Sequence, residues 1–522
     1  MKIPRRRVLA GAAAAVLGAA GAGASGTSPG AAADRARGRW PGVAAGPDFA
    51  ALARAVDGRV VLPGDGDYAE ARQLFQPRYD SVAPGAVAYP AHAGDVAVCL
   101  DFARRSAAPV VPRGGGHGYA GWSTVEAGLV VDVGAMAGVA VTGDEAHVGA
   151  GARLADVHAA LSGRGLGVPA GLCPSVGIAG LTLGGGLGLA SRAHGTTSDR
   201  LTGARVVTPD GEVREVGPDR DPELFWALRG GGGGNFGVVT EFRLRTHPVG
   251  DAAFAELHWP AADSAAVVHG WQRWLAALPD PFWSQAEFTV EAGSTAALAV
   301  RAVCLDGRGE LEREAGRLIG LVGREPRDSW TTVRGWEDTV RAMAGCPDGG
   351  PERCRLPGRL PGRDPRGVLG RDSYAARSDF WHGPGLPDAA VGAVLDALGR
   401  YGREVPSGGL GVVQFDGVCG GAVNRVPAGA TAFVHRDSAF LAQYLAYWPA
   451  SATPAAAARH QDWLDGLWRA LRPWAGGRAY QNYADPKLTG WREAYYGPNL
   501  PRLEGVRRAY DPDRLLRFPQ AV

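Results

Sequence analysis

The sequence predicts an α+β fold with more than one domain. Its 522 residues exceed what a single hydrophobic core usually organises. Between about residues 80 and 247, short apolar runs typical of strands alternate with helical patterns and glycine clusters. From 251 to 475 the composition changes, because this region holds 11 of the 15 tryptophans. Hydrophobic residues make up 46% and the net charge is +2, which fits a globular protein and argues against a nucleic-acid partner.

Capping and turn residues define the elements expected in the first region. Asp48 and Asp95 are candidate N-caps, because a short acidic side chain can accept hydrogen bonds from the first helical N–H groups. The expected helices span 49–56, 95–105 and 154–161. The strands are expected at 86–90, 109–112, 129–133, 140–141 and 238–244, with 203–207 and 213–216 joined as a hairpin by a Pro-Asp-Gly turn.

The tryptophan-rich region is expected to form a separate domain. Its apolar spacing predicts helices over 389–401 and 455–471. Shorter apolar runs predict strands over 411–415 and 431–434. Aromatic faces can stack on sugar rings or flat ligands, but most of these tryptophans are expected to pack in the core.

A stretch rich in proline, glycine and arginine, 345–370, is expected to be a long surface loop. It contains Cys346 and Cys354, which are close enough in sequence to pair. Sequence spacing does not give connectivity, so a disulfide and two free thiols both remain open.

The first 33 residues resemble a twin-arginine-type signal peptide. Arg5, Arg6 and Arg7 precede an apolar run rich in alanine and glycine that reaches about Ala24. We therefore expect the twin-arginine export machinery as a partner, and a secreted or extracytoplasmic protein with no membrane span after signal removal. An uncleaved anchor is the alternative, which the short, glycine-rich run disfavours.

Four blocks of residues are candidates for a functional site. The run 113–119 (Arg-Gly-Gly-Gly-His-Gly-Tyr) directly follows an expected strand, and consecutive glycines let backbone N–H groups surround an anion such as a pyrophosphate. The second block is 171–177 (Gly-Leu-Cys-Pro-Ser-Val-Gly) with the glycine-rich run 180–188, and the third is the five-glycine run at 230–234. The fourth is Tyr-Gln-Asn-Tyr at 480–483, followed by Tyr-Tyr-Gly-Pro-Asn at 495–499. Taken singly, each block also fits a flexible loop or ordinary packing.

Together these blocks, in this order, resemble the berberine bridge enzyme-like branch of the vanillyl-alcohol oxidase/p-cresol methylhydroxylase flavoprotein superfamily. The resemblance extends from about residue 70 to 520. It implies a two-part FAD-binding domain, formed by a PCMH-type segment at 70–247 and a C-terminal berberine-bridge-type segment at 476–522. The region 251–475 would then be an inserted α+β substrate domain built on an antiparallel sheet.

The resemblance also implies a covalently bound FAD. His117 matches the histidine bonded to the 8α-methyl of the isoalloxazine, and Cys173 matches the cysteine bonded to C6. Two bonds would make the ring a stronger oxidant and allow an open substrate groove. No metal ligand is predicted. The other residues expected to bind the cofactor are Arg113, Gly114, Gly115, Gly116, Gly118, Val176, Gly177, Gly184, Gly185, Gly186, His194, Gly195, Gly237, Val238, Val239, Asn482, Tyr496 and Asn499.

The family's tyrosine base falls in the C-terminal block, so Tyr480 is the first candidate to remove a hydroxyl proton. This role needs a phenol pKa lowered by a nearby positive charge or by hydrogen bonds to the phenolate. On an expected strand, Tyr480 and Asn482 share a face, whereas Tyr483, the second candidate, points away. Gln414 matches a substrate-facing position but cannot act as a base, which leaves one base. Tyr119 is expected to line the pocket, with a packing role as the alternative.

The function expected from these residues is an exported FAD-dependent oxidase acting on a mono- or oligosaccharide at its anomeric hydroxyl. A small residue at Val176 matches relatives in which O2 reaches the flavin and is reduced to H2O2. The main alternative is a tailoring oxidase or dehydrogenase of a natural product such as a glycoside, polyketide or alkaloid-like compound. A flavin-bearing binding protein is disfavoured by the intact segment around Tyr480.

Overall fold

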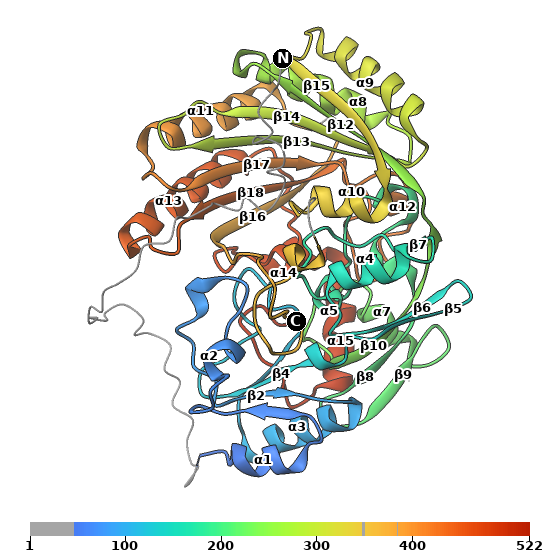
Figure 1. Cartoon of the computed structure of the whole chain (residues 1–522), viewed down its shortest axis with the longest axis vertical. Helices are drawn as coiled ribbons and strands as arrows, with labels where there is room; N and C mark the ends of the chain where they lie inside the picture. The colour runs from blue at the N-terminus through green and yellow to red at the C-terminus, as the bar shows by residue number, and fades with distance from the viewer. Residues whose placement is uncertain (1–45, 347–349, 384) are drawn as a thin grey trace.

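The fold is described from a computed structural model that places residues 46–346, 350–383 and 385–522 (Figure 1). Helices and strands alternate along the chain, which confirms the α+β prediction. The expected signal peptide, residues 1–33, lies outside the described residues. Within the described ranges, none of the helices combines the length and the apolar composition needed to cross a bilayer.

The N-terminal part contains a small mixed sheet. Strands β2, β3 and β4 are parallel, because the connections between them return the chain to the end of the sheet where the previous strand began. Strand β1 is antiparallel to β2. The order is β1-β2-β4-β3, with bounds Arg59–Val61 for β1, Ala86–Tyr89 for β2, Val110–Arg113 for β3 and Leu129–Asp132 for β4. Helices α1 (Phe49–Ala55) and α3 (Ala93–Ser106) pack together beside it (Figure 1).

An antiparallel five-stranded sheet follows in the order β5-β6-β10-β8-β9. The predicted hairpin is present, because β8 and β9 pair directly across the Pro-Asp-Gly turn. Helix α4 (Leu154–Ser162) lies where the sequence predicted it. The strand bounds are Val139–Thr142 for β5, Glu145–Gly149 for β6, Leu201–Val207 for β8, Val213–Val216 for β9 and Val238–Arg245 for β10.

A large antiparallel sheet is formed by residues 251–448, in the order β15-β12-β14-β13-β17-β18-β16. Side chains alternate between its two faces. Val413 and Phe415 of β17 belong to the core under the helices, whereas Gln414 and Asp416 face the opposite side. The bounds are Asp251–Trp259 for β12, Phe282–Glu291 for β13, Ala297–Cys304 for β14, Asp328–Gly335 for β15, Ser373–Trp381 for β16, Leu410–Asp416 for β17 and Phe440–Trp448 for β18.

Four helices cover the outer face of this sheet, and the other face is turned toward the N-terminal half of the chain (Figure 1). Most tryptophans of the region are buried, and Trp271, Trp274 and Trp381 fill the core between sheet and helices. Packing therefore accounts for most of them, as expected. The helices are α8 (Ser264–Ala276), α9 (Arg308–Val322), α11 (Asp388–Glu404) and α13 (Pro454–Leu471).

The C-terminal segment returns to the N-terminal half. Helices α14 (Trp491–Tyr496) and α15 (Leu500–Tyr510) pack into the same core as the five-stranded sheet. The buried Arg507 is held by Asp511 at 2.9 Å and donates to the side-chain oxygen of Asn235 at 3.2 Å. These contacts join the last 40 or so residues to the five-glycine block.

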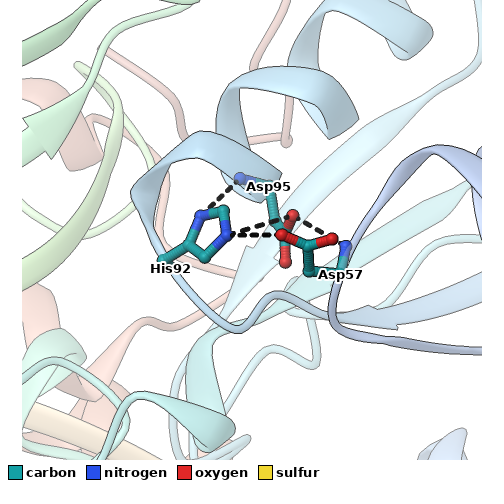
Figure 2. A group of neighbouring side chains, drawn as sticks. All are labelled: Asp57, His92 and Asp95. Carbon is teal, nitrogen blue, oxygen red and sulfur yellow. Dashed lines mark hydrogen bonds and ion pairs between the residues drawn. The ribbon is translucent and has the colours of Figure 1, made fainter.

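The start of α3 differs from the sequence prediction. His92, not Asp95, is the N-cap, and its Nδ1 accepts a hydrogen bond from the Asp95 N–H. Figure 2 shows how Asp95 lies one turn inside the helix, facing Asp57 and His92. Its carboxylate accepts from the backbone N–H groups of Asp57, Gly58 and Ala91 at 2.8–3.0 Å. Although burial opposes ionisation, these three donors hold the pKa of Asp95 below its usual value. Asp95 therefore ties two turns to the helix, a role that needs the tertiary fold.

The strand predicted over 431–434 is absent from the described structure, and this prediction is wrong. The segment runs as a buried loop against the five-glycine block instead. The Phe433 N–H donates to the Arg229 carbonyl at 3.0 Å. Gly230 must be glycine, because a Cβ there would lie 2.3 Å from the Phe433 nitrogen and its φ is +120°.

The loop at 345–370 contains a disulfide between Cys346 and Cys354, which settles the question that the sequence left open. The loop also does more than cover the surface. Leu360 is buried beside the four-stranded sheet, and its N–H donates to the Glu70 carboxylate at 2.8 Å. The predicted surface loop is therefore also fastened to the N-terminal half.

Candidate active site

One large cavity, of about 400 Å³, lies between the glycine-rich loops, the inner face of the large sheet and the C-terminal segment. Cavities of this size hold cofactors and small substrates. The sequence predicted many of its wall residues. The predicted residues that line it are Arg113, Gly114, Gly115, Gly116, His117, Gly118, Tyr119, Cys173, Val176, Gly177, Gly237, Val238, Val239, Gln414, Tyr480, Asn482, Tyr483 and Tyr496.

His117 is held in a fixed orientation in the cavity wall. Phe75 stacks on the imidazole with ring centroids 4.0 Å apart and planes at 21°. The Nε2 atom lies 2.8 Å from the Ser175 hydroxyl. Removal from water, together with the charge of Arg153, lowers the pKa of His117 to about 3. The imidazole is therefore neutral near pH 7 and keeps a lone pair for bonding.

Cys173 lines the same cavity from the second glycine-rich block. Burial raises the pKa of its thiol to about 11, so the sulfur is protonated at neutral pH. Cys173 is free in the structure, in contrast to the disulfide-bonded pair. The two residues predicted to hold the cofactor therefore share one cavity.

The glycine loops bring their backbones close together at the base of the cavity. A Cβ at Gly115 would lie 2.2 Å from the Gly177 nitrogen, so only glycine allows these loops to touch. Within the described chain, the N–H groups of residues 114–118 donate no hydrogen bond. Unpaired N–H groups around a cavity suit an anion. Arg113 lines the cavity but its charge is committed to Asp132, so the backbone is left to hold an anion.

The segment around Tyr480 is not a strand, which corrects the sequence prediction. Tyr480 caps the 3₁₀ helix η6 (Gln481–Tyr483), in which residues three apart share a face. The rings of Tyr480 and Tyr483 therefore touch, with centroids 5.0 Å apart, and both line the cavity. Tyr483 also stacks on Tyr119 at 5.1 Å.

The phenol oxygen of Tyr480 accepts two hydrogen bonds, from the Gly186 N–H at 3.0 Å and from the Asn482 amide at 2.9 Å. Both donors favour a phenolate. Burial outweighs them, however, and the pKa of Tyr480 is raised above its usual value. The lowered pKa that a tyrosine base requires is therefore not what the structure gives.

Sequence reasoning missed Asp416, a carboxyl group in the cavity wall. It lies two residues after Gln414 on β17 and so shares its face. Its Oδ1 accepts a hydrogen bond from the Trp283 indole at 2.7 Å. Burial raises the pKa of Asp416 to about 7. A carboxyl group poised near neutral pH can take up a proton during catalysis, and strand alternation alone could have revealed it.

Amide side chains surround Asp416 on the same sheet face. Gln414 donates to Glu287 at 2.6 Å, and Gln443 donates to the Tyr119 hydroxyl at 2.7 Å. Gln285 also lines the cavity. This face therefore offers several neutral hydrogen-bonding groups to a bound molecule.

Some predicted cofactor residues lie outside the cavity wall and serve other purposes. A Cβ at Gly184 would collide with the Asn482 amide, and His194 stacks on His247 with centroids 3.8 Å apart. Asn499 donates to the Ala428 carbonyl at 2.8 Å. The predicted residues that do not line the cavity are Gly184, Gly185, Gly186, His194, Gly195 and Asn499.

Comparison with known proteins agrees with this site. A family model for FAD binding domains matches residues 84–217, and a model described as berberine and berberine like matches residues 479–522. The FAD-linked oxidoreductase YgaK of Bacillus subtilis is 30% identical over 475 residues, covering 89% of this chain and 96% of that protein.

Two further relatives have a stated activity or a solved structure. A chitooligosaccharide oxidase of Gibberella zeae is 27% identical, covering 84% of this chain and 87% of that protein. The structure of Physcomitrella patens BBE-like 1 matches with a TM-score of 0.80 and 27% identity, covering 91% of this chain and 98% of that one.

FAD fits the residues of this chain. The unpaired N–H groups of residues 114–118 can hold its pyrophosphate, and the largely apolar cavity can take its ring system. The family models cover both segments that border the cavity. The chain therefore belongs to the berberine bridge enzyme-like FAD-linked oxidoreductases of the vanillyl-alcohol oxidase/p-cresol methylhydroxylase superfamily.

Proposed function

We propose that this protein is an exported oxidase that carries FAD on two covalent bonds and oxidises a CH–OH group of a carbohydrate, with O2 reduced to H2O2. The observation that carries the proposal is the meeting of His117, Cys173, Tyr480 and Asp416 around one cavity. Bound FAD would accept a hydride from the substrate carbon. The chain must then orient the substrate and take up its hydroxyl proton.

The two attachment points are supported by the state of each side chain. His117 is neutral and its ring is clamped by Phe75 and Ser175, so one nitrogen can be aimed at the 8α-methyl carbon. Cys173 stands in the same wall and forms no disulfide, so its sulfur is available; burial keeps it a thiol, which must lose its proton to bond to C6. Two bonds to one ring would keep it fixed while the cavity stays open to a large substrate.

We assign the base role first to Asp416. Its carboxylate forms near pH 7 and is hydrogen-bonded to Trp283, which fixes its direction. Tyr480, the base that the family resemblance implies, has a raised pKa and is the second choice. With a protonated phenol it can instead donate a hydrogen bond to the substrate oxygen. Tyr483 packs on Tyr480.

A carbohydrate is favoured by the groups on the sheet face. Gln285, Gln414 and Gln443 present amides that can pair with several hydroxyls, and Trp122 and Trp283 add aromatic surface to the wall. Two relatives are named as oxidases of oligosaccharides. They are the chitooligosaccharide oxidase of Gibberella zeae and a xylooligosaccharide oxidase of Thermothelomyces thermophilus, which is 28% identical to this chain.

Export and the use of O2 rest on sequence features. The twin-arginine-type segment at residues 1–33 supports passage through the membrane after folding, which lets the cofactor be loaded first. Val176 lines the cavity, and the family resemblance associates a small residue at this position with O2 reaching the flavin. Both features are consistent with a secreted enzyme that releases H2O2.

The test is a peroxide-coupled screen of the purified yellow protein. Mono- and oligosaccharides form one arm, and glycosides, polyketides and alkaloid-like alcohols form the other. Peroxide release with sugars supports the proposal. Release only with the second arm would replace the substrate class, and flavin reduction without peroxide would make the protein a dehydrogenase.

A further inference from the structure

We propose that Ser175 is a positioning residue for cofactor attachment: its hydroxyl holds the His117 proton on Nε2 and so leaves Nδ1 free to bond to the flavin methyl carbon. This inference rests on the proposed attachment through His117. It concerns how the chain prepares itself for that bond, before any substrate is oxidised.

The contacts of the imidazole distinguish its two nitrogens. Nε2 lies 2.8 Å from the Ser175 oxygen. Among the residues that the structure describes, none forms a hydrogen bond to Nδ1, although His117 lines the cavity. A neutral imidazole carries one proton, and the Ser175 oxygen can accept it when it lies on Nε2. In this tautomer, which the proposal assigns, Nδ1 keeps the lone pair that is available to a ring in the cavity.

The surroundings also keep the ring in this state. Phe75 stacks on one face of the imidazole, and this packing restricts rotation of the ring. The charge of Arg153 acts against a second proton on the ring. Ser175 itself is buried, and it belongs to the same block as Cys173. A hydroxyl at this position can therefore set the direction of His117 relative to the second attachment point.

The attachment step balances with dioxygen as the oxidant. A C8α–Nδ1 bond forms as one C–H bond of the 8α-methyl breaks and the Nε2–H proton leaves. The flavin ring gains two electrons, and both protons remain with the reduced ring. Dioxygen then removes two electrons and two protons and leaves as H2O2, which restores the oxidised ring.

A serine hydroxyl can form a hydrogen bond to Nε2 both before and after the bond to the flavin forms. Before the bond forms, its oxygen accepts the Nε2–H. Afterwards Nε2 has no proton, and the same hydroxyl can turn and donate to its lone pair. An alanine can do neither, whereas a threonine can do both. This difference provides the test.

The test uses full-length protein with Cys173→Ala, in which His117 makes the only bond to FAD. Ser175→Ala and Ser175→Thr are added separately, and Ser162→Ala, which removes a hydroxyl on α4 outside the cavity, is the matched control. Each protein is incubated with FAD in air, and the flavin that stays with acid-precipitated protein is followed over time. We expect Ser175→Ala to slow attachment about 10-fold or more, the scale of one lost hydrogen bond to a group that becomes charged. Ser175→Thr and Ser162→Ala should stay within about 2-fold of the parent, on the scale of a hydrogen bond that is retained.

The outcomes separate the two proposals. Attachment by Ser175→Ala at the parent rate would overturn the role of Ser175 alone. Complete release of FAD from the Cys173→Ala parent would overturn attachment through His117, and the role of Ser175 with it. NMR of the isolated flavin peptide gives a second readout: a bond to Nδ1 supports the proposal, and a bond to Nε2 contradicts it.

Discussion

Replacing Asp416 by asparagine tests the proposed base directly. Asparagine keeps the size of the side chain, and its amide oxygen can still accept the Trp283 indole N–H, now 2.7 Å from Asp416. Only the ability to take up a proton is lost. A lost general base typically slows the chemical step by about 10² to 10⁴-fold. We therefore expect flavin reduction in the Asp416→Asn variant to fall by at least about 10²-fold at pH 9.

The pH dependence gives the sharper measurement. With a pKa of about 7, Asp416 is roughly half ionised at pH 7 and about 1% ionised at pH 5. Reduction of the wild-type flavin should then rise about 10-fold per pH unit below 7 and level off above pH 8. The variant should show a flat profile over this range. Anaerobic stopped-flow absorbance of the flavin, in buffers of constant ionic strength, records both.

A second cavity carboxyl provides the control. Asp372 also lines the cavity, and burial raises its pKa to about 6. Asp372→Asn should keep the inflection near pH 7. A flat wild-type profile between pH 5 and 8, or an Asp416→Asn variant within about 3-fold of wild type, would refute the assignment, since a lost base costs far more.

The stability of the folded protein should fall as the pH rises, whereas the rate of flavin reduction should increase. The raised pKa means that the folded protein binds this proton more tightly than the unfolded chain, whose aspartates titrate near about 3.9. Stability from the neutral Asp416 is therefore complete below about pH 4 and is lost as the pH rises through 7. The Asp416→Asn side chain stays neutral. Its Tm relative to wild type should increase between pH 4 and pH 8, and an unchanged difference would contradict the buried, neutral state.

The remaining predictions concern the attachment points, Tyr480 and the disulfide. The His117→Ala and Cys173→Ala variants should each keep FAD on acid-precipitated protein, and only the variant with both changes should release it. Free flavin from either single variant would contradict attachment at two points. Tyr480→Phe should slow flavin reduction by about 10-fold or more through loss of its hydroxyl, without moving the inflection near pH 7, whereas a lost inflection would make Tyr480 the base. Cys346→Ser with Cys354→Ser should lower the free energy of unfolding by about 2–3 kcal/mol for so short a loop, as measured by denaturant titration. An unchanged midpoint would mean that the loop is held by its other contacts.

Elements with local signals could be predicted from the sequence. The hairpin of β8 and β9 follows from its Pro-Asp-Gly turn, and the helix after Asp48 begins where its cap predicts. Elements shaped by distant partners could not. Asp95 holds turns that only the fold brings together, and the segment 431–434 gives its backbone N–H to a glycine-rich loop some 200 residues earlier.

The site shows the same division. His117 and Cys173 stand in distinctive glycine-rich blocks, so the motifs predicted both and the structure brings them to one cavity. Ser175 lies in the same block as Cys173, but its importance depends on the Nε2 of His117, a partner that the sequence does not reveal. Asp416 shares a strand face with the predicted Gln414, but the burial that raises its pKa is seen only in the fold. His194, also predicted to bind the cofactor, does not line the cavity and stacks on His247, so its role stays a prediction.

The central claim is that one FAD is bonded to this chain at two points. The most direct test is mass spectrometry of the purified, denatured protein and of its proteolytic peptides. We expect the intact chain to retain the mass of one FAD, and a single flavin to join the peptide containing His117 to the peptide containing Cys173. A denatured chain without flavin mass, or a flavin on only one of these peptides, would contradict the claim.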